Sequence, residues 1–342
     1  MQRLRHPCVR IAAVALVLAG ALWFAGSRLE ASAASADRLV ARDAMPMLAL
    51  ALALFMLAAL LLGGVWIVLV ESATGRASRR IELMLGFLYA WIARYIPGTL
   101  PYLAGKVYLA RRAGYETRSL VMMAAVQNIV EAVAASVFAL AALALTAHPV
   151  LGMPLALALA LTPLPVLAVL HPRAVVAASA PLLRLCGRAP LPRGELPSPR
   201  AMLVAVALVF ASQAANALAL LAILHAAGAA AWSDAPLVAA ASSVAGVAGM
   251  VVVLAPAGLG VRDGAMAALL ASRFVVQTAT LAAVALRLLT VIADLVLTAV
   301  ALLVDVALRK HVLWRALRGD LRPAPSRAQD PPVAALPQET AA

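Results

Sequence analysis

The segment Arg94-Tyr95-Ile96-Pro97-Gly98-Thr99-Leu100-Pro101 interrupts a long apolar region, and Gly105 and Lys106 follow it closely. A second segment of the same kind reads Ala255-Pro256-Ala257-Gly258-Leu259-Gly260-Val261-Arg262-Asp263-Gly264. Proline has no backbone N–H to donate, and glycine costs about 1 kcal/mol relative to alanine inside a helix. Both segments therefore predict breaks between helices.

The composition places these breaks in a membrane protein. Hydrophobic residues make up 65% of the 342 residues and charged residues only 13%, which is typical of integral membrane proteins. Six apolar runs approach or exceed the ~20 residues that cross a bilayer: 47–70, 120–147, 150–170, 201–224, 237–254 and 278–304. Since the bilayer does not hydrate the backbone, each break must be buried in protein or line a watery cavity.

We predict an all-α polytopic membrane protein with about six full spans and two re-entrant broken-helix hairpins, or eight hydrophobic segments in total. The first hairpin comprises 81–96 and 100–110, and the second comprises 237–254 and 266–276. The run 237–254 could instead be a full span, which would move the second break to the cytoplasmic side.

Charge sets the expected orientation. The net charge of +13 would suit nucleic acid, but the basic residues concentrate in loops, which favours a positive-inside membrane topology and no nucleic acid. We expect both termini in the cytoplasm and a bacterial-type inner (plasma) membrane. The run 11–26 resembles a signal peptide, but we favour a retained first span because the loop charges require an inside N-terminus.

The predicted domains follow this topology. Residues 1–306 form the membrane domain, with halves at about 47–147 and 201–306 and a linker at 171–200; residues 307–342 form a basic cytoplasmic segment and then a disordered tail. Each half is a span, a hairpin and a span, in opposite orientations. Asn128 follows Pro97 by 31 positions and Arg287 follows Pro256 by the same 31. Together these features predict an inverted repeat of the kind seen in secondary transporters.

Polar residues inside the predicted spans share helix faces. Glu131 lies four residues after Gln127 and three after Asn128, and Asp294 lies seven after Arg287. A charge at mid-bilayer costs roughly 2.5–3.5 kcal/mol, so each needs a partner or a function. We favour function for Glu131, Arg287 and Asp294, with Arg287 paired to Glu131. Interhelical packing is the alternative, and we favour it for Gln213 and Asn216.

Arg94, Lys106 and Arg262 lie beside the breaks. They are either snorkelling anchors at the interface or part of a site for an anionic headgroup. We find no metal-ligand spacing, no cofactor fingerprint and no enzyme motif, so no cofactor or metal and no catalytic residue is predicted.

The two breaks also carry a resemblance. The stretch from Ala93 to Gly98, with Gly105, Lys106 and the later Arg111-Arg112-Ala113-Gly114, is similar to the first signature of the lysylphosphatidylglycerol synthase membrane-region family, whose domain is flippase-like. The stretch from Leu254 to Gly264 resembles its second signature, and Arg287 matches a family arginine. The similarity covers roughly residues 10–306. Ala257 replaces a glycine, Asp263 replaces the usual Glu, and Gln127-Asn128 replaces an acidic-basic pair.

The resemblance implies lipid handling by a stand-alone member, because the chain after residue 306 is too short for the synthase domain. We expect a translocase for anionic, aminoacylated or glycosylated membrane lipids. The alternatives are an accessory subunit beside a membrane enzyme of lipid-linked glycosyl or aminoacyl transfer, and a small-solute secondary transporter. The residues that we predict for the substrate path are Arg94, Tyr95, Pro97, Gly98, Lys106, Gln127, Asn128, Glu131, Pro256, Gly258, Gly260, Arg262, Asp263, Arg287 and Asp294.

Overall fold

The computed structural model describes residue 39 and residues 41–75, 79–95, 100–146, 196–251 and 261–318. Within these ranges every regular element is a helix, as predicted. The predicted runs 11–26 and 150–170 lie outside the described residues, as do most of the linker and the tail from 319. The same is true of the predicted site residues Pro97, Gly98, Pro256, Gly258 and Gly260.

Among the residues that the structure describes, four helices are long and apolar enough to cross a membrane. They are α3 (Met45–Thr74, preceded by η3 at Arg42–Ala44), α6 (Thr117–Ala144), α10 (Pro199–Ala226) and α13 (Val276–Ala307). Each coincides with one of the predicted runs, at 47–70, 120–147, 201–224 and 278–304. The chain is therefore a multi-pass helical membrane protein.

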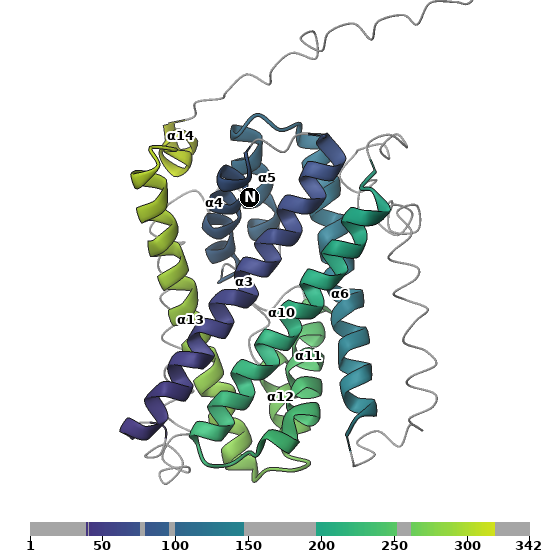
Figure 1. Ribbon diagram of the computed structural model, residues 1–342, viewed down its shortest axis with the longest axis vertical. Helices are drawn as coiled ribbons and strands as arrows, with labels where there is room; N and C mark the ends of the chain where they lie inside the picture. Colours follow the sequence, from purple (N-terminus) through teal and green to yellow (C-terminus); the bar gives the residue numbers. More distant parts are fainter. Residues whose placement is uncertain are drawn as a thin grey trace, which may run out of the picture.

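Short helices fill the intervals between the long ones. Between α3 and α6 lie α4 (Arg80–Trp91), the 3₁₀ turn η4 (Ile92–Tyr95) and α5 (Leu100–Arg112). Between α10 and α13 lie η6 (Trp232–Asp234), α11 (Ala235–Val251) and α12 (Val261–Leu270). α4 packs against α5 and α11 packs against α12. The two pairs occupy opposite ends of the bundle (Figure 1).

Glycine allows α4 and α5 to approach closely. A Cβ atom built on Gly105 would lie 3.2 Å from the Cβ of Ala90, and one built on Gly86 would lie 3.2 Å from the Cβ of Leu109. Both glycines therefore face the partner helix, and the two helices lie too close together for a larger side chain at either position.

The second short pair differs from the prediction in one respect. The helix predicted at 266–276 begins earlier, at Val261, and ends at Leu270. Arg262 and Asp263 looked like loop residues, but Asp263 lies in the first turn of α12, where a carboxylate interacts favourably with the helix dipole. α11 has 17 residues, about 26 Å of helix at 1.5 Å per residue.

α3 and α10 form the centre of the bundle and run antiparallel (Figure 1). The C-terminal half of α3 shares a hydrophobic cluster with the start of α10 and with α4–α6, whereas its N-terminal half shares another with the end of α10 and with α11–α13. Many buried positions on both helices are small, among them Ala51, Ala58, Ala59, Gly63, Ala205, Ala215 and Ala219. The Ser212 hydroxyl on α10 donates to the backbone oxygen of Ala58 on α3 at 3.1 Å, which shows how near the two helices lie.

A short helix, α14 (Val312–Arg318), ends the described chain. Asp305 near the end of α13 accepts hydrogen bonds from the backbone N–H groups of Val312 and Leu313, at 2.9 and 3.2 Å. The same carboxylate accepts from the Tyr89 hydroxyl of α4 at 3.0 Å. This side chain therefore joins α14 and α13 to the first short pair.

Candidate functional site

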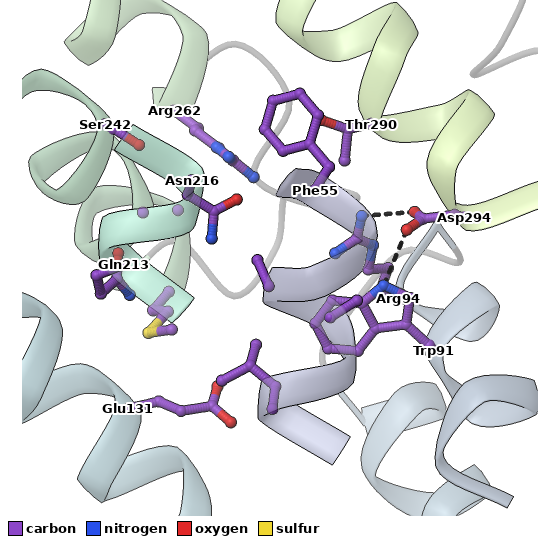
Figure 2. A pocket seen from close by; sticks show the side chains of 16 residues that line it. Phe55, Trp91, Arg94, Glu131, Gln213, Asn216, Ser242, Arg262, Thr290 and Asp294 are labelled. Carbon is purple, nitrogen blue, oxygen red and sulfur yellow. Dashed lines mark hydrogen bonds and ion pairs between the residues drawn. The ribbon is translucent and has the colours of Figure 1, made fainter. Parts of the chain in front are cut away.

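A cavity of about 220 Å³ lies at the centre of the bundle, where α4 and α11 end and α12 begins. Residues from both halves of the chain line it (Figure 2). The lining residues are Phe55, Ala58, Ala59, Leu62, Trp91, Arg94, Glu131, Gln213, Asn216, Ser242, Gly246, Gly249, Met250, Arg262, Thr290 and Asp294. Four of these side chains are ionisable, which is costly at this depth and marks the cavity as the candidate site.

Asp294 on α13 is the best-connected acid of the cavity. It accepts from Arg94 Nη2 at 2.5 Å, from the Tyr95 hydroxyl at 2.5 Å and from Trp91 Nε1 at 2.9 Å. All three donors belong to the last turns before the first break, on α4 and η4. This carboxylate therefore fixes the end of α4 and the turn η4 against α13, in the second half of the chain.

Arg94 is held by aromatic rings as well as by its acid. Its guanidinium carbon lies 4.4 Å from the centre of the Trp91 ring and 5.4 Å from that of Tyr95. Cation–π contacts of this kind favour a charged side chain in a partly dehydrated position. Arg94 Nε remains buried without a hydrogen-bond partner, so the guanidinium retains one unused donor.

Arg262 enters the same cavity from the start of α12. Figure 2 shows its side chain pointing between Asn216 and Ser242 on one side and Phe55 and Thr290 on the other. Its Nε is buried and has no hydrogen-bond partner. It also lies within electrostatic range of two further arginines, Arg94 and Arg287.

Arg287 and Asp263 also keep unused polar atoms. Arg287 Nη2 and Asp263 Oδ1 are buried and form no hydrogen bond. Neither residue is among those that line the cavity. Two guanidinium groups thus lie within electrostatic range of that of Arg262 near the start of α12, with Asp294 engaged to one of them, and each of the three keeps an N–H donor without a hydrogen-bond partner.

A second set of hydrogen-bonded polar residues, on α5 and α6, reaches the cavity through Glu131. Lys106 Nζ on α5 donates to Gln127 Oε1 at 2.8 Å, and Gln127 Nε2 donates to Glu131 Oε1 at 2.7 Å and to the backbone oxygen of Leu62 at 3.2 Å. Lys106 also lies over the rings of Trp66 and Tyr102, 4.8 and 4.9 Å from their centres. Of these residues, Glu131 and Leu62 line the cavity.

The structure therefore brings Arg94, Glu131, Arg262 and Asp294 to one cavity, with Tyr95, Lys106 and Gln127 directly behind it. Asn128 instead donates to the backbone of its own helix, to Ala124 at 2.9 Å. The predicted pair between Arg287 and Glu131 is wrong. Glu131 bonds to Gln127, and the cross-helix partner of Asp294 is Arg94.

Some lining residues were not predicted as part of the substrate path. Gln213 and Asn216 were assigned to packing, and both line the cavity. Gln213 Oε1 accepts from the Ser243 hydroxyl of α11 at 3.4 Å, and Asn216 donates to the backbone oxygen of Ser212 in its own helix at 3.0 Å. Trp91 was not singled out, although it precedes Arg94 by three positions and so lies on the same helix face. Phe55 and Ser242 carry no signal in the sequence that distinguishes them from packing residues.

Comparison of the sequence with known proteins assigns the chain to a family. In the part of the chain that the structure describes, no three His, Cys, Asp or Glu side chains are grouped so as to hold a metal ion. No curated protein matches the sequence. The sequence model of the lysylphosphatidylglycerol synthase TM region matches residues 10–298, a range that contains both short helix pairs and the whole cavity. The chain belongs to the lysylphosphatidylglycerol synthase TM region family.

Proposed function

We propose that this protein is a lipid translocase, which moves a lipid with a polar or charged headgroup between the two leaflets of a membrane. The headgroup passes through the central cavity while the acyl chains stay in the bilayer. The observation that carries the proposal is the unpartnered guanidinium Nε of Arg262, pointing into a cavity at the middle of a helical bundle. Membership of a flippase-like family supports it.

Burial of the arginine donors is costly without a ligand. A charged group with an unused donor is unfavourable in a low-dielectric interior unless something completes its hydrogen bonds. The oxygen atoms of an anionic headgroup do this well, because charge-assisted hydrogen bonds from arginine are strong and often bidentate. Arg262 and Arg94 line the cavity and each keeps such a donor, and Arg287, which does not line it, keeps another within electrostatic range of Arg262.

The architecture that we propose for this path is an inverted repeat with two re-entrant hairpins. α4–α5 would enter from the cytoplasmic side and α11–α12 from the outer side of a bacterial inner membrane, with both chain termini in the cytoplasm. Three observations support it: the pairs lie at opposite ends of the bundle, α3 and α10 are antiparallel, and each pair follows one of these two helices (Figure 1).

The test is an assay in liposomes. The purified protein is reconstituted with trace lipids that carry a fluorescent acyl chain, with anionic, aminoacylated or glycosylated headgroups in separate preparations. A membrane-impermeant quencher then destroys the label in the outer leaflet. We expect the quenchable fraction of at least one lipid to rise from about half, the share in the outer leaflet, towards the whole population.

Arg262→Gln is the informative variant, and Arg200→Gln is its matched control. Arg200 is exposed at the start of α10, so the control changes the same charge away from the cavity. We expect Arg262→Gln to lose movement of the lipid and Arg200→Gln to keep it. Protein that moves none of the lipids would contradict the proposal.

The cavity would also hold a small anion, which makes a small-solute transporter the second candidate. Uptake of radiolabelled phosphate or a carboxylate into the same vesicles, lost in Arg262→Gln, would favour that function. If neither lipid nor solute moves, an accessory role beside a membrane enzyme that transfers glycosyl or aminoacyl groups to lipids becomes the best account. Co-purification from native membranes would then test it.

A further inference from the structure

The row of hydrogen bonds formed by Lys106, Gln127 and Glu131 is not explained by binding of an anion to the arginines. It links α5 and α6, and the backbone oxygen of Leu62 adds α3. Only 1% of the Lys106 surface, 0% of Gln127 and 7% of Glu131 are exposed. Glu131 nevertheless lines the cavity, whereas Lys106 and Gln127 do not. The carboxylate is therefore the end of the row that a solute in the cavity can reach.

The chemistry of the partners fixes the direction of every bond in this row. A lysine ammonium group only donates and the Leu62 carbonyl only accepts, so the Gln127 amide must present its oxygen to Lys106 and its nitrogen to Leu62 and Glu131. Glu131 Oε1 acts as an acceptor in this arrangement. A protonated carboxyl group can still accept there and carry its proton on the other oxygen. The hydrogen bonds of this row can therefore form whether Glu131 is ionised or protonated.

Proton binding at Glu131 changes the charge of the cavity. Its ionisable lining residues are Arg94, Arg262, Glu131 and Asp294. With Glu131 ionised these four charges sum to zero, and with Glu131 protonated they sum to +1. Across the residues that the structure describes, no cationic nitrogen lies within 4.0 Å of the Glu131 carboxylate, so its charge is not cancelled by a direct ion pair.

The groups around Glu131 differ in what they contribute. From α5, Lys106 acts through Gln127 and Tyr102 has a buried hydroxyl without a hydrogen-bond partner. The polar cavity residues of α10 and α11, which pack against α6, are Gln213, Asn216 and Ser242, and none of them titrates in the physiological range. α3 contributes the Leu62 carbonyl oxygen. The remaining charges facing the cavity are Arg94, Arg262 and Asp294.

We propose that Glu131 is a proton-binding site that couples translocation to a proton gradient, so that one proton crosses the membrane together with one anionic headgroup. The step is the simple reaction of a carboxylate with H⁺ to give a carboxylic acid, reversed on the opposite side. This inference rests on the proposed lipid translocation. An anion binds more tightly when Glu131 is neutral, and by linkage a bound anion favours the proton at Glu131.

The experiment uses liposomes with a trace of acyl-labelled phosphatidylglycerol and a pH difference of one unit, with the membrane potential clamped at zero. Samples are withdrawn at intervals and quenched at a common pH. A pH difference of one unit is a tenfold ratio of proton concentrations. If one proton crosses with each lipid, the labelled lipid should reach a ratio between the leaflets of about ten at equilibrium. The excess should lie on the less acidic side.

Glu131→Gln keeps a carbonyl acceptor for Gln127 but cannot bind a proton. We expect any lipid that this variant moves to reach a ratio near one between the leaflets at any pH difference. Glu116→Gln is the matched control, because Glu116 is exposed at the start of the same helix; it should accumulate the label as the unaltered protein does.

The outcomes separate the two proposals. Exchange of lipid with a ratio of one in the unaltered protein would overturn proton coupling and leave translocation intact. No exchange with any probe would overturn translocation and this inference with it. If Glu131→Gln cannot be purified in folded form, proton uptake by the unaltered protein, measured with a pH indicator, tests the proposal instead. Binding of short-chain phosphatidylglycerol should take up about one proton per protein, and no uptake would refute the proposal.

Discussion

Arg94 and Asp294 are joined by an ion pair of 2.5 Å although 200 positions separate them in the chain. Arg94 belongs to η4, the 3₁₀ turn that follows α4 within the first short pair, and Asp294 lies midway along the last long helix. The side chain of Asp294 is only 4% exposed and that of Arg94 is 22% exposed. The contact therefore holds the two halves of the protein together at the cavity wall.

Replacing Asp294 by Asn should destabilise the protein by about 3 kcal/mol, because removal of one partner leaves a largely buried cation unpaired. Because Arg94 is partly exposed, the expected loss of stability lies at the low end of the range for buried ion pairs. Thermal unfolding in detergent measures the effect. Glu71→Gln breaks the pair with Arg80, whose side chain is 66% exposed and so remains hydrated without its partner, and it should change the melting temperature little. Equal shifts for the two variants would contradict the structural role of Asp294.

Trp91→Phe should destabilise the protein by roughly 2 kcal/mol, the usual worth of a hydrogen bond to a charged group. The variant removes the indole N–H that donates to Asp294 at 2.9 Å but keeps an aromatic ring beneath Arg94. Thermal unfolding again provides the measurement, with Trp232→Phe as the control because Trp232 is 54% exposed. A larger loss of stability for Trp232→Phe would show that the volume of the ring, and not the hydrogen bond to Asp294, determines the effect.

Arg287→Gln should abolish lipid movement with little change in melting temperature. Its Nη2 atom is buried without a hydrogen-bond partner, so the folded protein loses no bond from that atom, whereas a bound anion loses a charged donor. Liposome assays and thermal unfolding are measured on the same preparation. A folded, fully active variant would exclude Arg287 from the path, and a misfolded one would show a structural role.

Gly105→Leu should destabilise the protein by more than 1 kcal/mol, since even a Cβ atom there lies 3.2 Å from Ala90 and overpacking typically costs 1–3 kcal/mol. Gly264→Leu is the control, because no atom lies within 4 Å of a Cβ built at Gly264. We expect the first variant to lose the close packing of α4 on α5 and the second to remain folded. Unfolding in detergent and protease resistance measure both effects.

The sequence predicted the four long helices well because each contains a long, predominantly apolar run in which charged residues such as Arg287 and Asp294 are rare. It also predicted short helices on both sides of each break, since Pro and Gly end helices locally. The start of α12 at Val261 was missed. A helix that begins with Arg262 and Asp263 has no apolar period in its first turn, so periodicity cannot find it.

The charged residues that line the cavity were singled out from the sequence, but their partners were not. Arg94, Glu131, Arg262 and Asp294 stood out because each is a charge inside or beside an apolar run. Their partners depend on how the helices rotate and cross, and sequence spacing contains no such information. Glu131 thus pairs with Gln127 of its own helix, and Asp294 with Arg94 from a distant turn. Trp91 and Ser242 became visible only when the cavity placed them beside these charges.

The close contact between α3 and α10 has a consequence for how this protein tolerates change. Buried alanine and glycine there leave almost nothing to remove, so truncation at these positions costs little, whereas any added methyl group pushes two backbones apart. Mutational tolerance along this contact is therefore one-sided: a library of variants should retain glycine at Ala51 and Ala219 and lose leucine and phenylalanine.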